Sequence, residues 1–175
     1  MASERRASER RRFPPGVELR EAISLREFLP YRIHHLASKV AMPPPFELPD
    51  GRIIRAREWR VILQLAARGP LTNGELAELV GMDAATITRV AQHLGDLGLV
   101  TAKVSSTDRR KQIVSLTPAG AEAHDLIAPG RREAAEAMIA GLDAPEREQL
   151  FQLLDKLEAH LSGLGAVADD AHWES

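Results

Sequence analysis

Residues 71–100 read LTNGELAELVGMDAATITRVAQHLGDLGLV, and this stretch decides the fold. Thr72 and Glu75 have the spacing of a capping box, which begins a short helix that stops at Gly81. Asp83 caps a second helix almost at once. Two capped helices separated by a short turn that contains a glycine are typical of a helix–turn–helix.

Apolar residues in this stretch recur at the interval that a compact three-helix core needs: Leu76, Leu79, Val80, Met82, Ile87, Val90, Leu94 and Leu97. The remaining residues of the second helix are small or polar, and we predict that they face outward: Ala84, Ala85, Thr86, Thr88, Arg89, Gln92 and His93. Such a face can enter a DNA major groove, where Thr and Gln hydrogen-bond to base edges or phosphates. A helical hairpin that only packs or binds protein is the alternative interpretation.

A β-hairpin is predicted directly after the second helix, from the β-rich runs at residues 99–104 and 112–116. Its turn carries Asp108, Arg109 and Arg110, so we interpret the hairpin as the wing of a winged helix. An arginine at a wing tip can enter the narrow minor groove, and Asp108 can hold it in place. The alternative is a solvated, charged loop.

Charge is unevenly distributed along the 175 residues, although the formal net charge is only −2. Residues 1–20 and residues 103–112 are both basic, whereas residues 143–175 are acidic. A nearly neutral total can therefore conceal a local nucleic-acid-binding face.

The chain has no cysteine, which excludes disulfides, Cys-ligated zinc and thiol redox switches. The sequence shows no apolar run of membrane-spanning length and no secretory signal, so we expect a cytoplasmic protein without a membrane partner.

The rest of the chain predicts a mainly α fold: a winged helix-turn-helix plus a helical dimerisation domain. We expect a helix over 18–41 kinked at Pro30, a stiff Pro-rich loop at 42–51, and helices at 54–68, at 118–140 and from Asp143 onward. On one side of the 54–68 helix we expect Trp59, Ile62, Leu63 and Ala66. The predicted division is a disordered Arg-rich arm (1–17), a dimerisation helix with the Pro-rich loop (18–51), the DNA-binding domain (52–117), dimerisation helices (118–162) and a flexible acidic tail (163–175).

A candidate effector pocket is indicated by polar and aromatic residues on the first helix. Tyr31, Arg32, His34 and His35 lie close together in sequence, and Trp59 lies near the start of the next predicted helix. Polar groups converging in an apolar cleft are suited to an anionic aromatic or acyl-thioester ligand. The alternatives are interface or surface histidines and a core tryptophan. We find no metal-ligand spacing, phosphate-binding glycine loop or nucleophile elbow, so we predict no cofactor and no enzymatic activity.

Four stretches of the sequence resemble the MarR family of winged-helix transcriptional regulators: 26–40, 56–100, 107–120 and 142–161. The most specific match is the Asp-x-Arg of the wing, Asp108 and Arg110, followed by a strand that ends in Leu-Thr-Pro-x-Gly. The resemblance implies a homodimer that binds double-stranded DNA at a palindromic operator, usually as a repressor, and is released by a small ligand. It also implies that Thr86, Thr88, Arg89 and Gln92 occupy recognition-helix positions.

Two functions of different class remain open from the sequence. The first is a ligand-responsive DNA-binding repressor, which the charged wing favours. The second is a winged-helix protein-interaction or ligand-sensing module without sequence-specific DNA binding.

Overall fold

The computed structural model describes residues 21, 23–40, 44–104, 108 and 111–170, with side chains as far as residue 163. The chain divides into two compact units, Met1–Ala41 and Met42–Ser175. The predicted disordered arm at 1–17 lies outside the described residues. The mainly α fold with a small β-hairpin wing that the sequence predicts is confirmed.

The first unit contains helix α1, Leu29–Lys39. This helix is shorter than the predicted helix over 18–41, and the prediction of a kink at Pro30 is wrong. Pro30 lies in the first turn, where its missing N–H would have had no intrahelical partner. Proline therefore begins this helix instead of bending it.

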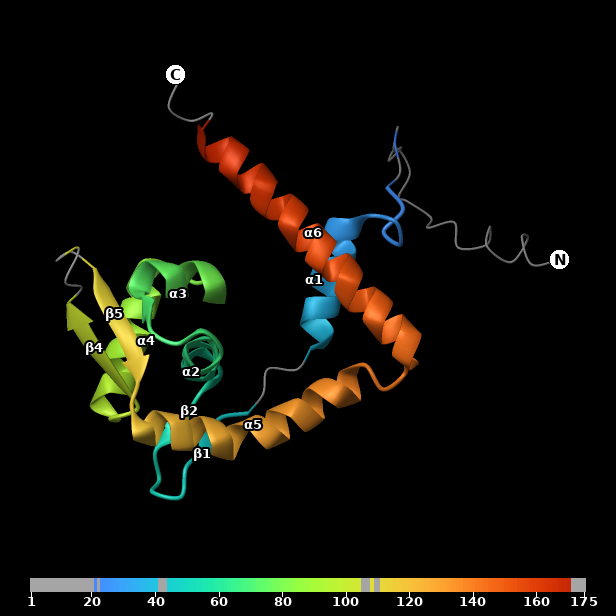
Figure 1. Ribbon diagram of the computed structural model, residues 1–175. Helices are drawn as coiled ribbons and strands as arrows, with labels where there is room; N and C mark the ends of the chain where they lie inside the picture. Colours follow the sequence, from blue (N-terminus) through green and yellow to red (C-terminus); the bar gives the residue numbers. More distant parts are fainter. Residues whose placement is uncertain (1–20, 22, 41–43, 105–107, 109–110, 171–175) are drawn as a thin grey trace, which may run out of the picture. The chain divides into compact units, whose positions relative to one another are not determined.

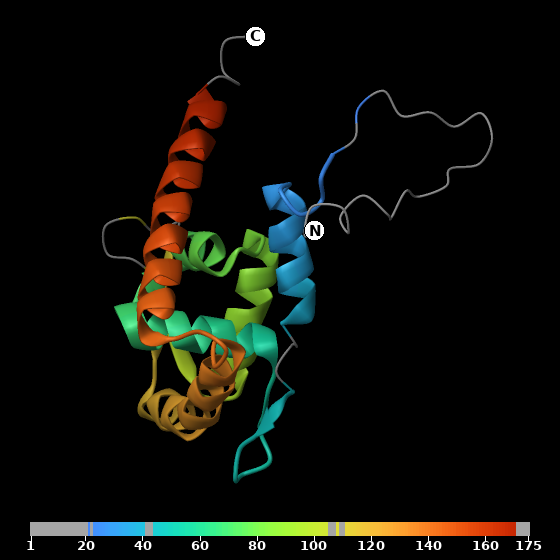
Figure 2. The ribbon, with the colours of Figure 1, turned by 90° about the vertical axis from the view of Figure 1, so that its right-hand side faces the viewer.

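The second unit begins with a β-hairpin where the sequence predicts only a stiff loop. Strands β1 (Phe46–Glu47) and β2 (Ile53–Ile54) are antiparallel, with Phe46 opposite Ile54. Gly51, in the turn between the strands, adopts a φ of 85°. The hairpin is the cyan loop at the bottom of Figure 2. Leu48 and Ile54 are buried in the core, and their burial attaches this hairpin to the winged helix.

The winged helix consists of α2 (Ala56–Arg68), β3 (Leu71–Thr72), α3 (Asn73–Val80), α4 (Ala84–Asp96), β4 (Val100–Val104) and β5 (Gln112–Leu116) (Figure 1). The three strands form an antiparallel sheet in the order β3-β5-β4, with Ala102 and Leu71 both opposite Val114. Helices α2, α3 and α4 pack against one another, and α4 also contacts β4. The predicted helix–turn–helix and its β-hairpin wing are therefore present.

The core of this domain comes from one face of each helix and from the sheet. Its fully buried side chains include Val61, Ile62, Leu76, Ile87, Leu94, Leu99 and Val114. On α2, Trp59 and Ile62 are buried as predicted, but Leu63 and Ala66 are exposed. Val61 and Leu65 are buried instead, because the face of α2 that meets α3 and α4 also includes these positions.

Two longer helices complete the second unit: α5, Pro118–Met138, and α6, Ala144–Asp170. Thr117 caps α5 with Pro118 in the first turn, as predicted, and Pro129 lies within the helix without ending it. Helix α6 continues to Asp170, whereas the sequence predicts a flexible tail from residue 163. Among the helices that the structure describes, none is both long and apolar enough to cross a bilayer.

Candidate nucleic-acid interface

Helix α4 is the element that would enter a DNA groove, and Asp83 fixes its beginning. The Asp83 carboxylate accepts hydrogen bonds from Thr86 N–H at 2.8 Å and from the Thr86 hydroxyl at 2.7 Å. These two bonds to Thr86 hold the pKa of Asp83 below its usual value. The N-terminal turn of α4 therefore has a defined conformation before any partner binds.

The predicted DNA-contacting side chains of α4 lie on its surface and are partly ordered by one another. Arg89 Nη2 donates to the Thr86 hydroxyl oxygen at 3.1 Å, and Arg89 and Gln92 are exposed. The Thr88 hydroxyl donates to Ala84 O at 2.8 Å. Because both Thr hydroxyl protons are engaged within the helix, these two side chains offer oxygen acceptors and methyl groups to a partner. Arg89 has further guanidinium N–H groups that can donate hydrogen bonds to such a partner.

His93, which the sequence predicts to face outward, is half-buried and lies beside the beginning of α2. Its Nε2 lies 4.0 Å from Glu58 Oε1, and Glu58 is buried with its other oxygen accepting Arg55 N–H at 2.7 Å. Together with the exposed Arg57, these residues border a hollow of about 390 Å³ between α2 and α4. Arg55 and Arg57 were not among the predicted site residues, although their position at the start of the helix before the helix–turn–helix was a usable signal.

The wing follows α4 as predicted, and the described part of its turn is compact. Lys111 N–H donates to Asp108 O at 2.9 Å, and Asp108 is half-buried. Arg109 and Arg110, the predicted minor-groove residues, lie outside the described residues. Lys111 is exposed and was not selected as a site residue from the sequence, although it lies within the basic segment 103–112.

A second hollow, of about 580 Å³, separates the wing from the beginning of α3 and the middle of α4. Asn73, Gly74, Thr88, Lys111 and Gln112 are among its lining residues. The two hollows border α4 at different residues, since Arg89 and His93 line the first and Thr88 lines the second. An exposed helix face bordered in this way is suited to the major groove of a duplex.

The residues predicted to bind an effector are found in two places. On α1, Tyr31 stacks on His35 with ring centroids 5.8 Å apart, Arg32 Nη1 donates to Arg26 O at 3.0 Å, and His34 is exposed. In the second unit, Trp59 is buried and stacks on His124 of α5 at 5.6 Å. Trp59 is thus packed in the core of its unit, and a pocket joining it to the α1 cluster stays a prediction.

Metal coordination has no candidate in the part of the chain that the structure describes, where no three His, Asp or Glu side chains are grouped to hold an ion. The site is therefore a surface of helix and hairpin, and its chemistry is that of hydrogen bonds and charge.

Comparison with known proteins agrees with this geometry. A family model described as MarR family matches residues 54–111, which span α2 to the turn of the wing. The repressor NicR of Pseudomonas putida is 36% identical over 100 residues, which are 57% of this chain. Residues 54–111 thus resemble the MarR family. The chain spans less than two thirds of the length of the curated relatives it matches, 63% in the case of NicR.

Solved structures similar to this chain cover more of it. BpsR of Bordetella bronchiseptica, whose DNA binding is regulated by 6-hydroxynicotinic acid, is 25% identical with a TM-score of 0.61. That match covers 73% of this chain and 98% of BpsR. A protein described as a probable transcriptional regulator of Pseudomonas aeruginosa is 28% identical with a TM-score of 0.62, over 77% of this chain and 99% of its own. The likeness therefore extends beyond the winged helix.

Proposed function

We propose that this chain is a homodimeric, ligand-responsive transcriptional repressor that acts in the cytoplasm and binds a palindromic operator in double-stranded DNA. The observation that carries the proposal is the exposed polar face of α4, which two hollows border, with the wing beside it. Arg89 and Gln92 contact base edges in the major groove, and Thr86 and Thr88 contact bases through methyl groups and oxygens. Asp108, Arg109 and Arg110 serve the adjacent minor groove.

A dimer presents two copies of this interface to the same DNA duplex. Two recognition helices related by twofold symmetry read half-sites about one helical turn of DNA apart, which is why the operator is a palindrome. The exposed leucines of α6 and the exposed apolar residues of α1 support this assembly, because isolated helices with such surfaces are poorly soluble. The match of residues 54–111 to the MarR-family model also supports it.

Titration of DNA from upstream of the chain's own gene tests the proposal, with a random duplex of equal length as the comparison. Replacing Arg89, Gln92 or Arg110 by Ala weakens operator binding by about 1–3 kcal/mol per half-site, the usual value of one specific contact. Arg110→Ala also makes the salt dependence shallower, since fewer counterions are released. Arg68→Ala is the matched control, because Arg68 is exposed at the far end of α2 and its Nε donates to Gln64 Oε1 of its own helix.

Equal affinity of the unaltered protein for operator and random duplex would overturn the proposal. It would favour a protein-interaction or ligand-sensing winged helix instead. Reduced repression of a reporter carrying the same DNA, for the variants but not the control, would connect binding to regulation.

The effector of this repressor is a small anionic aromatic compound or an acyl thioester. BpsR supports the aromatic class, since its DNA binding responds to an aromatic carboxylic acid. The Tyr31–His35 stack with Arg32 beside it offers an aromatic surface, hydrogen bonds and one positive charge. His34, on the same helix, belongs to the proposed set.

Variants Arg32→Ala and His35→Ala then bind operator normally but require more effector for release. Titrating 6-hydroxynicotinic acid and benzoate against the protein–DNA complex measures this. Release of both variants at unaltered effector concentrations would place the effector elsewhere.

A further inference from the structure

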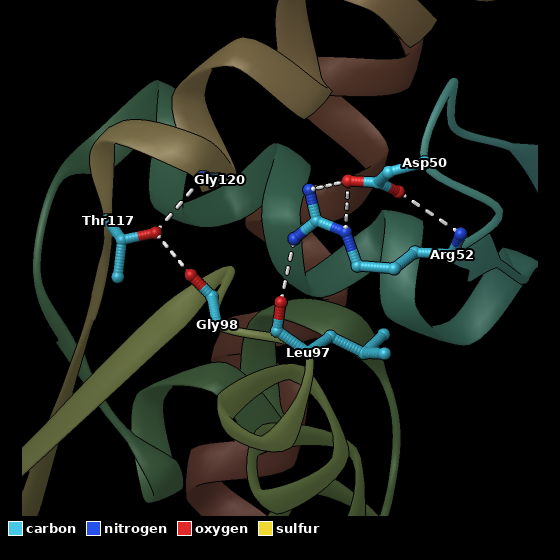
Figure 3. A network of polar contacts seen from close by, with 6 residues as sticks. All are labelled: Asp50, Arg52, Leu97, Gly98, Thr117 and Gly120. Atoms are coloured by element: carbon cyan, nitrogen blue, oxygen red, sulfur yellow. Dashed lines mark hydrogen bonds and ion pairs between the residues drawn. The ribbon is translucent and has the colours of Figure 1, made fainter.

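The turn that connects α4 to β4 is held by side chains from outside the helix–turn–helix (Figure 3). Arg52, from the turn of the β1–β2 hairpin, donates from Nη1 to Leu97 O at 2.7 Å, across 45 positions of sequence. The same guanidinium contacts the Asp50 carboxylate through Nε at 2.8 Å and Nη2 at 2.6 Å. Asp50 also accepts the Arg52 backbone N–H at 3.1 Å, so the side chain that reaches Leu97 is itself fixed.

Leu97 is the residue at which α4 ends, and its carbonyl is one of the acceptors that a helix leaves without an intrahelical donor. A guanidinium at this position satisfies the acceptor and also faces the negative end of the helix dipole. Arg52 therefore acts as a C-terminal cap for the recognition helix, supplied by a distant segment of the chain.

Thr117, at the start of α5, holds the next two carbonyls. Its hydroxyl donates to Gly98 O at 2.7 Å, and its backbone N–H donates to Leu99 O at 3.0 Å. Three consecutive carbonyls, from Leu97 to Leu99, are thus bonded to Arg52 and Thr117. Gly98 has a φ of 71°, a left-handed conformation that favours glycine and turns the chain from helix to strand.

The β1–β2 hairpin that carries Arg52 is anchored as well. Leu48 is 3% exposed, and Arg131 of α5 donates from Nη2 to Pro44 O at 2.8 Å, just before β1. Arg52 is therefore mounted on a segment with its own attachment to α5 and to the core. Because the backbone of Arg52 is anchored, its guanidinium can restrain the position of Leu97 O. An arginine on an unanchored loop would move together with the carbonyl that it binds.

We propose that Arg52 is a positioning residue for DNA recognition. It holds the α4–β4 turn so that the exposed face of α4 and the wing meet one duplex in a fixed relation. The two elements diverge at this turn, so a small rotation there displaces the wing relative to the groove that α4 occupies. The inference rests on the proposed function and assigns to the β1–β2 hairpin a part in it.

Three variants and one control test this role in the full-length protein. Arg52→Ala removes the guanidinium, Arg52→Lys keeps the charge without the forked geometry, and Asp50→Asn weakens only the support of Arg52. Arg68→Ala removes the same charge from an exposed site on α2. Each protein is titrated with operator and with random duplex, well below its melting temperature, and backbone hydrogen exchange is measured without DNA.

Arg52→Ala is expected to lose operator affinity about tenfold or more, the ratio that one charge-assisted hydrogen bond supplies. Its affinity for random duplex should fall only as much as that of Arg68→Ala, because both lose one positive charge. The loss of operator affinity for Arg52→Lys and for Asp50→Asn should be intermediate. Exchange should accelerate at Leu97 and Leu99, whose N–H groups donate to His93 O and Leu94 O, with α2 and α3 unchanged.

Operator affinity of Arg52→Ala equal to that of Arg68→Ala overturns the inference, as does unchanged exchange at the turn. A lower melting temperature with full operator affinity also overturns it, because that result describes a purely structural bond. Should Arg52→Ala fail to fold, Asp50→Asn and Arg52→Lys decide by the same two measurements. If the unaltered protein does not distinguish operator from random duplex, the proposed function fails. Faster exchange then still establishes the Arg52 cap, without a role in DNA binding.

Discussion

The winged helix turns the apolar faces of its helices inward, whereas α1 and α6 leave theirs at the surface of the single chain. In α2 and α4, residues such as Ile62 and Ile87 are fully buried. In α1, Leu36 is 58% exposed, and in α6, Leu153 is 55% exposed. All four positions follow helical periodicity, so periodicity alone does not separate them. The difference is whether the chain itself supplies the covering surface.

This contrast divides the molecule by what stabilises it. The winged helix has a core of its own, so its stability is a property of one chain. The apolar faces of α1 and α6 are expected to gain their stability by burial against a second copy. Substitutions in the first region should therefore change unfolding, and substitutions in the second should change association.

Gly120, where α5 meets the winged helix, offers the largest expected effect. A Cβ at this position would lie 2.0 Å from Leu99 O, the carbonyl that Thr117 N–H also holds. Gly120→Ala should therefore lower the free energy of unfolding by about 3 kcal/mol, at the upper end for overpacking, or prevent folding. Denaturant titration measures this change.

Gly130→Ala is the matched control within the same helix, since a Cβ there meets nothing within 4 Å. It should stabilise α5 by up to about 1 kcal/mol, because alanine favours helix over glycine. Equal stability of the two variants would contradict the close packing of α5 on the α4–β4 turn.

The second prediction concerns association through α6. The leucine stripe of α6 consists of Leu150, Leu153, Leu154, Leu157 and Leu161. Leu154→Lys combined with Leu157→Lys places two charges in this stripe, where Leu154 is 42% exposed in the single chain. The dimer dissociation constant should rise by at least about a hundredfold, as for loss of central interface residues. Sedimentation velocity over a concentration series measures it.

Gln152→Lys combined with Ala159→Lys is the control, because these residues lie on the same helix outside the leucine stripe. Its dimer should persist, and the winged helix should melt alike in both double variants if the two regions are independent. A folded dimer from Leu154→Lys with Leu157→Lys would refute the assignment of α6 to the interface.

The sequence predicted the winged helix well because its signals are local. The capping pairs Thr72–Glu75 and Asp83–Thr86 lie three residues apart, and the structure forms both. The exposure of Arg89 and Gln92 also followed from periodicity. Such signals depend on neighbouring residues alone, so no knowledge of tertiary contacts was needed.

The sequence could not show what depends on distant segments. The cap on Leu97 comes from Arg52, and the anchor of Pro44 comes from Arg131, and neither pair has a sequence signature. The β1–β2 hairpin was missed because prolines dominate residues 43–49 and its strands are only two residues long. Stability there comes from burial of Leu48 and Ile54, which is a tertiary effect.

The smallest expected effect is the acid sensitivity of the α4 cap. Bonds from the Thr86 hydroxyl and N–H lower the pKa of Asp83, so the folded state binds its proton less readily than the unfolded chain. The stabilisation is therefore complete above the ordinary aspartate value of about 3.9 and is lost as the pH falls through the lower native pKa. Thr72 acts in the same direction on the pKa of Glu75.

Thermal melts between pH 7 and pH 3 measure this effect on the winged helix. Asp83→Asn keeps a capping side chain but does not titrate, so its melting temperature should be slightly lower at pH 7 and fall less steeply below about pH 4. Glu78→Gln removes an exposed carboxylate of α3 away from its capping box and should follow the unaltered protein. If all three melting curves ran parallel with pH, the Asp83 carboxylate would not be the group that couples acid to the start of the recognition helix.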